Sequence, residues 1–458
     1  MNDTCAFEPM ACPDGGECVD GACVQVGCRD DGECNDGDAC TVDTCVNGQC
    51  ASRALVCNVG ENCVNGNCVP TDELDVSISG CPDSLQADGV VVLRAIVVNA
   101  LGDVTFEWTA TSGTFDDASN ANPTFTAASS DAVVTVTATE TGSSSVAQDD
   151  CTIDVTIPVL FVANSQGDNI TSYVLVPTPS EEDVAPDTNL TGGLTGLDQS
   201  ADIAVTPGGL LMVINVTGNS LNFYGNATAA DGDTAPERVV QGDSTGFDAP
   251  ATVAYDPAND LVFVANVLGN SDILVFAGAS DAGLNGNVAP TRTIMSAALS
   301  APFGINLDAA GNLYVANNGD TNILVFADAA GADGDVAPSR TITADTFVNL
   351  FDVFVDGDDN LYVVDTGDDE ILIFRNASTL DGELIPDAVI AIPSAVGLAS
   401  IVVDENDTGY ITDSGRNALY VFDHVSTLNG TVDPDRTIQG VSTQLNNPIG
   451  LFLFFAQD

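Results

Sequence analysis

The stretch DAAGNLYVANNGDTNILVF, Asp308 to Phe326, decides the fold of this chain of 458 residues. It holds a polar turn, an apolar strand LYVAN, a second polar turn and a second apolar strand ILVF. Related segments (LFVAN, LMVIN, VFVAN, LYVAN, LYVVD, GYITD) recur in steps of 51, 51, 51, 48 and 48 residues, beginning at Leu160, Leu211, Val262, Leu313, Leu361 and Gly409. Self-similarity at this period predicts six copies of one small β unit.

Each copy contains four apolar strands. One precedes the repeated segment, as in ADIAV from Ala201, and the fourth follows a Pro-containing loop, as in DGDVAPSRTI from Asp333 to Ile342. Four short strands every fifty residues are typical of a propeller blade, so we expect a six-bladed β-propeller over residues 158–458. The first copy lacks its inner strand and the C-terminus carries an extra one, Ile449 to Phe454, so we expect both chain ends to complete one blade and leave no open edge.

The copies Asp308 to Phe326 and Asp356 to Phe374 resemble NHL-type repeats, in which an inner strand, an Asp-x-x-Gly-Asn turn and a Leu-Tyr-Val-Ala-Asn strand follow one another. The resemblance spans about 300 residues. It implies a six-bladed propeller, and propellers of this family serve as binding platforms, scaffolds and, less often, hydrolases or lyases.

Residues 1–72 are rich in cysteine. The pattern Cys-Val-[Asp/Asn]-Gly-x-Cys occurs at Cys18, Cys45 and Cys63, and Asp-Gly and Asn-Gly favour two-residue hairpins. We expect small disulfide-bonded modules with pairing left open, because twelve cysteines allow too many combinations. The segment CNDGDACTVDTC resembles a slime-mould-type cysteine repeat, which implies an extracellular spacer. The expected disulfide cysteines of this region are Cys5, Cys12, Cys18, Cys23, Cys28, Cys34, Cys40, Cys45, Cys50, Cys57, Cys63 and Cys68.

Residues 73–157 show short alternating segments separated by Gly, Asp, Ser and Asn, a pattern typical of a β-sandwich. Cys81 and Cys151 lie near its ends, with Trp108 between them, and we expect one disulfide and one buried indole in its core. The pattern resembles immunoglobulin-like or PKD-like modules of bacterial surface proteins, which implies a spacer. The chain as a whole is therefore predicted to be all-β.

Charge excludes several functions. The formal net charge is −58, from nine arginines and no lysine against 67 acidic residues. Phosphate recognition needs clustered basic residues, so nucleic-acid binding is excluded. The longest apolar runs, Val90 to Leu93 and Leu451 to Ala456, are shorter than the ~18 residues of a membrane span.

Cysteine density indicates an oxidising compartment, so we expect an extracellular or cell-surface protein with its signal peptide removed.

Eight Asn-x-Ser/Thr sequons are candidate glycosylation sites, compatible with a surface glycoprotein. They begin at Asn2, Asn169, Asn189, Asn215, Asn226, Asn376, Asn406 and Asn429.

Two features suit Ca²⁺, which binds clustered oxygen ligands. One is the end of the second strand of each blade, which carries Asn or Asp in all six copies, including Asn317, Asp365 and Asp413. The other is the acidic turn with Asp356, Asp358 and Asn360. A side chain that simply opens a turn accounts for both. Arginines recurring at the start of the fourth strand, Arg238, Arg292, Arg340 and Arg436, are expected to pair with a repeated carboxylate or a carbonyl of the Pro-containing loop.

Catalytic motifs are few. The one histidine, His424, would have to serve any Ser-His-acid triad, and no Gly-x-Ser-x-Gly motif accompanies it.

We therefore expect a secreted, non-enzymatic surface or matrix protein acting in adhesion or in assembly of a fibre or layer. Its partners would be proteins, glycans or further copies of itself. The alternative is a calcium-dependent lactonase-like hydrolase with the metal in the propeller channel. A third hypothesis, a carbohydrate-binding propeller, needs exposed aromatic residues, and the sequence offers few.

Overall fold

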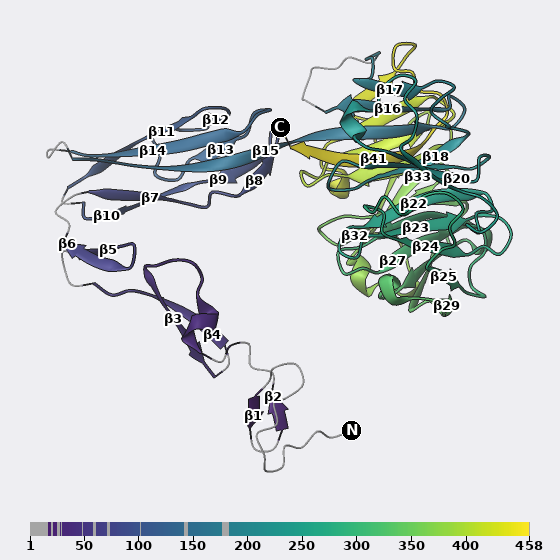
Figure 1. Ribbon diagram of the computed structural model, residues 1–458. Helices are drawn as coiled ribbons and strands as arrows, with labels where there is room; N and C mark the ends of the chain where they lie inside the picture. The colour runs from purple at the N-terminus through teal and green to yellow at the C-terminus, as the bar shows by residue number, and fades with distance from the viewer. Residues whose placement is uncertain are drawn as a thin grey trace. The chain divides into compact units, whose positions relative to one another are not determined.

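The computed structural model describes residues 17–19, 22–24, 28, 30–47, 49–57, 61–70, 74–100, 102–141, 145–175 and 183–457. The chain forms two compact units. Unit 2 comprises Asp83–Val90, Thr126–Ala132 and Ile153–Asp458, and the other described residues belong to unit 1 (Figure 1). The expected all-β character is confirmed, since regular structure beyond strands is limited to short 3-10 turns in the described residues.

Three hairpins lie in the cysteine-rich part of unit 1: β1 (Glu17–Val19) with β2 (Ala22–Val24), β3 (Thr41–Val46) with β4 (Gln49–Ala54), and β5 (Glu61–Val64) with β6 (Asn67–Pro70). Each places the first and last cysteine of its motif opposite one another, as in Cys45 and Cys50. The short 3-10 turn η2 (Asp31–Cys34) precedes β3.

In the β3–β4 and β5–β6 hairpins the disulfides do not join the cysteines that face each other. They link Cys28 to Cys45, Cys34 to Cys50, Cys40 to Cys63 and Cys57 to Cys68. The network therefore connects neighbouring segments rather than closing each hairpin on itself. Cys5 and Cys12 lie outside the described residues, and for Cys18 and Cys23 only the strands are described.

The segment after the hairpins forms three small pairings. β7 (Asp75–Ser79) pairs with β10 (Arg94–Val98), and β13 (Thr124–Thr126) lies between β12 (Thr114–Phe115) and β9 (Val90–Val92). β11 (Val104–Ala110) pairs with β14 (Ala132–Glu140), which adjoins β15 (Val146–Asn164). Trp108 is buried and its indole N–H donates to Asn120 O at 2.9 Å, and Cys81 is joined to Cys151. The immunoglobulin-like topology stays a prediction.

Six antiparallel sheets make up the propeller, and five of them follow one another directly along the chain. From the inner to the outer position, the first two sheets contain β18 (Ser200–Val205), β19 (Leu211–Asn215), β20 (Ser220–Tyr224) and β21 (Arg238–Gln241), and then β22 (Pro250–Asp256), β23 (Leu261–Asn266), β24 (Ile273–Ala277) and β25 (Arg292–Met295). The next two contain β26 (Pro302–Leu307), β27 (Leu313–Asn317), β28 (Asn322–Phe326) and β30 (Arg340–Thr343), and then β31 (Leu350–Val355), β32 (Asn360–Asp365), β33 (Glu370–Arg375) and β35 (Ala388–Ala391). The fifth contains β36 (Leu398–Val403), β37 (Gly409–Asp413), β38 (Ala418–Phe422) and β40 (Arg436–Gln439).

The sixth sheet joins the two ends of the propeller sequence, as predicted. Its inner strand is β41 (Pro448–Gln457), which pairs antiparallel with β15 and so leads to β16 (Asn169–Val174) and β17 (Thr188–Thr191). Leu160 lies opposite Leu453 in this pairing. Figure 1 shows β41, at the yellow end of the colour bar, beside β15. The last strand therefore closes the ring.

Neighbouring blades are linked by a pairing that the sequence did not reveal. The first residues of the Pro-containing loops form β29 (Gly334–Asp335), β34 (Gly382–Glu383) and β39 (Gly430–Thr431), each parallel to the outer strand of the preceding blade. Single bridges, Leu190 to Gly232 and Val240 to Gly286, do the same at two further junctions. Each loop thus covers the outer edge of its neighbour.

Two of the four repeated arginines, Arg238 and Arg340, join blades through loop carbonyls, one of the two kinds of partner that the pairing hypothesis predicted. Arg238 donates to Asp281 O, Leu284 O and Ala279 O at 2.8–3.1 Å. Arg340 donates to Ala377 O, Leu380 O and the Tyr314 hydroxyl at 2.7–2.9 Å. Arg436 instead pairs with Asp423 at 3.7 Å. The receiving carbonyls lie at turns after the third strand, such as η6 (Ala377–Thr379).

Candidate functional site in the propeller channel

The six inner strands contact one another in a closed ring, β18 to β22, β26, β31, β36, β41 and back to β18. Near its start each carries an apolar residue followed by a small or polar one. The second residues of these pairs, the channel ring, are Asp202, Thr252, Gly304, Asp352, Ser400 and Gly450. Asp202 and Asp352 are three blades apart and therefore lie on opposite strands, as do the two hydroxyl residues and the two glycines.

Two cavities of about 160 and 260 Å³ lie along these inner strands. Asp202, Asp352 and Ser400 border both cavities, so the polar part of the channel ring separates them. The walls of the smaller cavity are mainly apolar and include Phe303 and Phe351, whose ring centroids are 4.9 Å apart.

The two carboxyls are held by neighbouring strands. Asp352 Oδ2 accepts from Ser400 Oγ at 2.7 Å and from Ile401 N at 3.3 Å, while its Oδ1 accepts from Val353 N at 2.9 Å. Asp202 Oδ2 accepts from Val253 N at 2.9 Å. Glycine at position 304 is required by this arrangement, because a Cβ there would overlap Asp352 Oδ1.

Among the described residues, no arginine or histidine borders either cavity. Burial raises the pKa of Asp352 to about 6. Burial raises the pKa of Asp202 well above its ordinary value, and the negative charge of Asp352 raises it further. Both residues are half-buried along the channel, and enclosed carboxylates without a cationic partner are costly, so these groups either take up protons or attract a cation. The channel can thus exchange a proton near neutral pH or hold a small cation.

The sequence-predicted calcium residues do not form one cluster. Asn360 begins β32 and Asp365 ends it, so their backbones are about 16 Å apart at ~3.3 Å per residue. At the first end, Asp356 Oδ1 accepts from the N–H groups of Asp358 and Asn360, and its Oδ2 accepts from Asn360 Nδ2 and the Tyr362 hydroxyl. This carboxylate organises the turn between β31 and β32.

At the other end, each Asn or Asp that ends a second strand is buried and receives backbone N–H groups. Asn317 Oδ1 accepts from Ser300 N, Asp365 accepts from Val348 N and Asn349 N, and Asp413 accepts from Val396 N. The donors lie 16 or 17 residues upstream, in the loop before the inner strand of the same blade. These side chains therefore fix that loop, whereas the sequence suggested only the following turn. That turn is also bonded, by Gly367 N to Asp365 and Arg416 N to Asp413.

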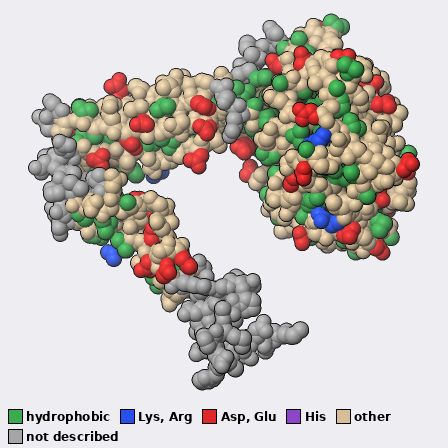
Figure 2. All heavy atoms as spheres, viewed as in Figure 1, with side chains coloured by type: hydrophobic (Ala, Val, Ile, Leu, Met, Phe, Trp, Pro, Cys, Tyr) green, Lys and Arg blue, Asp and Glu red, His purple; other side chains and the backbone are tan. Residues whose placement is uncertain are grey.

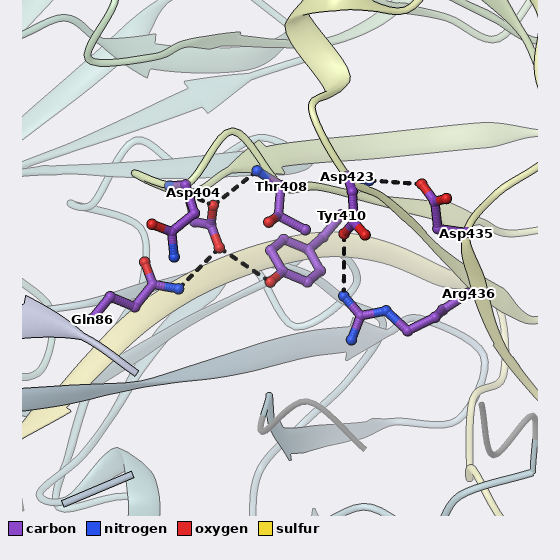
Figure 3. Close-up of polar contacts among 8 residues, drawn as sticks. Gln86, Asp404, Thr408, Tyr410, Asp423, Asp435 and Arg436 are labelled. Atoms are coloured by element: carbon purple, nitrogen blue, oxygen red, sulfur yellow. Dashed lines mark hydrogen bonds and ion pairs between the residues drawn. The ribbon is translucent and has the colours of Figure 1, made fainter. Parts of the chain in front are cut away.

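An acidic groove of about 280 Å³ lies between the turns after β31 and β36. In the part of the chain that the structure describes, no arginine borders it and five carboxylates do: Asp356, Asp358, Asp404, Glu405 and Asp407. Asp404 accepts from Thr408 N at 2.9 Å, the Tyr410 hydroxyl at 3.3 Å and Gln86 Nε2 at 3.0 Å (Figure 3). Gln86 ends β8 (Ser84–Gln86), which pairs parallel with β15 within unit 2. Residue 86 gave no signal of this role in the sequence.

The sequons differ in exposure. Asn215 is fully buried, and Asn169 is buried with its Nδ2 donating to Asn189 Oδ1 at 2.8 Å. Asn189 is half-buried, and Asn226, Asn376, Asn406 and Asn429 are exposed, while Asn2 lies outside the described residues. In the folded chain the exposed four are the accessible acceptors. His424 is also exposed and precedes the turn η7 (Val425–Thr427).

Comparisons with known proteins concern the fold. No family model and no curated protein matches the chain. A nidogen/laminin complex is similar at 14% identity and TM-score 0.49, over 66% of this chain and 100% of that chain. Virginiamycin B lyase from Staphylococcus aureus is similar at 13% sequence identity and a TM-score of 0.39, over 58% of this chain and 80% of that chain. A protein of unknown function from Bacteroides thetaiotaomicron is similar at 14% sequence identity and a TM-score of 0.43, over 83% of this chain and 93% of that chain. Likeness at this level carries no argument about ligand or activity.

Sequence reasoning missed Asp202 and Asp352 as site residues. A signal was available, because each inner strand carries a small or polar residue at the same place within an apolar stretch (ADI, ATV, FGI, FDV, ASI, IGL). Aligning the six copies at this position would have shown two acidic residues three blades apart.

Proposed function

We propose that this chain is a secreted, non-enzymatic surface or matrix protein that acts in adhesion or in assembly of an extracellular layer or fibre. Its cysteine-rich part serves as a cross-linked spacer and its propeller as the binding head. The partners are proteins or glycans of the same surface, or further copies of the chain.

The disulfide network is the observation that carries the proposal. All six residues of β4 are exposed, and in the described residues from 28 to 68 only Cys28 and Cys34 are buried. A segment with so little apolar burial depends on cross-links for its structure, and such cross-links persist in oxidising surroundings. No helix among the described residues is long and apolar enough to span a membrane.

Surface charge supports the same role. Figure 2 shows Asp and Glu side chains spread over the visible face of the chain with few Arg side chains among them. The acidic groove concentrates five carboxylates, with no basic residue among the described residues that border it. Such a surface engages basic partners or partners bridged by Ca²⁺.

Binding of the labelled full chain to the surface or matrix of its native cells tests the proposal, with and without 2 mM Ca²⁺ and after reduction of disulfides. We expect saturable binding that Ca²⁺ strengthens, and cross-linking followed by mass spectrometry should identify propeller residues at the contact. Absence of saturable binding, together with absence of self-association, would contradict the proposal.

A lactonase-like hydrolase is the second candidate, and the channel ring favours it. Two enclosed carboxyls beside the Ser400 hydroxyl border cavities, as a catalytic cation or general base would require. Assays of a panel of lactones with and without Ca²⁺ decide between the non-enzymatic surface protein and the hydrolase. Turnover that chelation abolishes and that Asp352→Asn lowers at least 100-fold would establish the hydrolase.

A further inference from the structure

A third cavity, of about 690 Å³, lies where the last blade meets the blade that closes the ring. We call it the junction cleft. It is bordered by the turn between β15 and β16, strand β17, the turn between β37 and β38, and the loop between β40 and β41. Six of its side chains are amides: Asn169, Asn189, Asn417, Gln439, Gln444 and Asn446.

The junction cleft is lined by one basic side chain, whereas most charged side chains of the molecule are acidic. The chain has 67 acidic residues and nine arginines, yet among the described residues that border the cleft Arg416 is charged and none is a carboxylate. Three carboxylates accept backbone N–H groups at its border: Asp183 from Ser442 N at 2.6 Å, Asp231 from Asn189 N at 2.8 Å and Asp413 from Arg416 N at 2.9 Å. The described residues offer the Arg416 guanidinium no hydrogen bond or ion pair.

Arg416 is an addition to a turn that does not need it. The corresponding turn between β19 and β20 has Gly218 in this position. In both turns a glutamine donates to the backbone oxygen of that residue, Gln241 to Gly218 O at 2.7 Å and Gln439 to Arg416 O at 2.8 Å. The backbone arrangement is thus the same, and the arginine side chain contributes nothing to it.

Gln444 is a second departure from the repeat. Its φ is 59°, in the left-handed region, where the corresponding loops carry Gly196 and Gly246 at φ 67° and 77°. The loops are otherwise alike, since Thr195, Thr245 and Thr443 each donate to a glycine oxygen at 2.8 Å. A side chain in this conformation costs about 1 kcal/mol relative to glycine.

We propose that the junction cleft binds an acidic saccharide through one uronate-type unit. Amides both donate and accept hydrogen bonds, which matches the hydroxyls of a sugar, and a guanidinium matches a carboxylate in bidentate geometry. Long-range repulsion by the net charge is limited, because the Debye length is about 8 Å at physiological ionic strength. The inference rests on the proposed extracellular binding function and names one ligand class for it.

The test measures binding of a glucuronate-containing trisaccharide to the full chain by calorimetry at 150 mM salt. Carboxyl-reduced trisaccharide and acetate are the comparison ligands. We expect the acidic sugar to bind at least tenfold more tightly than either. Equal binding of the reduced sugar would overturn the role of the carboxylate, and equal binding of acetate would overturn the role of the sugar.

Two variants copy the sister blades and should therefore fold. Arg416→Gly should weaken acidic sugar binding at least tenfold with an unchanged melting temperature. Gln444→Gly should weaken it while the melting temperature stays equal or rises. Arg375→Ala, at an exposed position outside the cleft, is the matched control and should bind normally. Normal affinity in both cleft variants would overturn the proposal.

The same variants separate this inference from the proposed function. If the wild-type chain binds its native surface and Arg416→Gly binds equally well, only the inference fails. If the wild-type chain binds no surface component, the proposed function fails, and the trisaccharide measurement still decides whether the cleft is a sugar site.

Discussion

Asp352 carries the clearest consequence at the scale of a single residue. Burial raises its pKa from 3.8 to about 6, so the folded state favours the protonated carboxyl more than the unfolded state does. Its stabilising effect is therefore complete below pH 3.8 and is lost as pH rises through 6. Since one pKa unit equals about 1.4 kcal/mol, the free energy of unfolding should fall by about 3 kcal/mol from this group between pH 4 and pH 7.5.

Urea unfolding of wild type and Asp352→Asn at several pH values checks this. The decisive quantity is the difference in slope between the two proteins from pH 5 to 7, because Asn removes the titration whatever its effect on absolute stability. Parallel curves would show that the Asp352 carboxyl does not titrate with a raised pKa.

Arg340 gives a second prediction at this scale. Its three hydrogen bonds reach the next blade and a tyrosine of its own blade, so Arg340→Ala removes the donor of Leu380 O and leaves Ala377 O with the Leu380 N–H alone. We expect a loss of about 3 kcal/mol in the free energy of unfolding. Arg375→Ala, which removes one exposed bond to Ser426 O, should cost less than about 1 kcal/mol. Similar losses in both variants would contradict the conclusion that Arg340 stabilises the contact between neighbouring blades.

The element that closes the ring is β41. Gly450 lies where a Cβ would overlap Ala201 O and approach Asp202 Cα at 2.7 Å, so β18 and β41 can pack only with glycine there. Gly450→Val should lower the melting temperature by at least 5 °C, and deletion of residues 447–458 should abolish a cooperative melt. Gly357→Ala meets nothing within 4 Å and serves as the control. A cooperative melt after the deletion would contradict closure by β41.

Strands could be predicted where a segment of sequence repeats, but not where a strand pairing involves only two residues. Six copies of a five-residue apolar segment fixed the blade count, and the surplus strand at Ile449 identified the closure. β29, β34 and β39 escaped prediction because each is a two-residue pairing with a strand of the preceding blade. The Gln86 contact with Asp404 spans 318 residues and has no local signal.

At the scale of the whole molecule, 58 excess negative charges oppose compaction. The Debye length falls from about 30 Å at 0.01 M to about 3 Å at 1 M salt, so added NaCl should raise the melting temperature by several degrees. Ca²⁺ added at constant ionic strength should raise it further if carboxylates bind the ion. Differential scanning calorimetry separates the two, and an unchanged melting temperature on chelation would remove the calcium hypothesis.

The central claim is that this chain works as a component of an extracellular surface. Electron microscopy of the protein purified from its native surface at physiological Ca²⁺, with mass spectrometry to identify associated molecules, tests it most directly. The account predicts ordered fibres or layers, or particles that retain a surface partner. Dispersed, partner-free particles would contradict it.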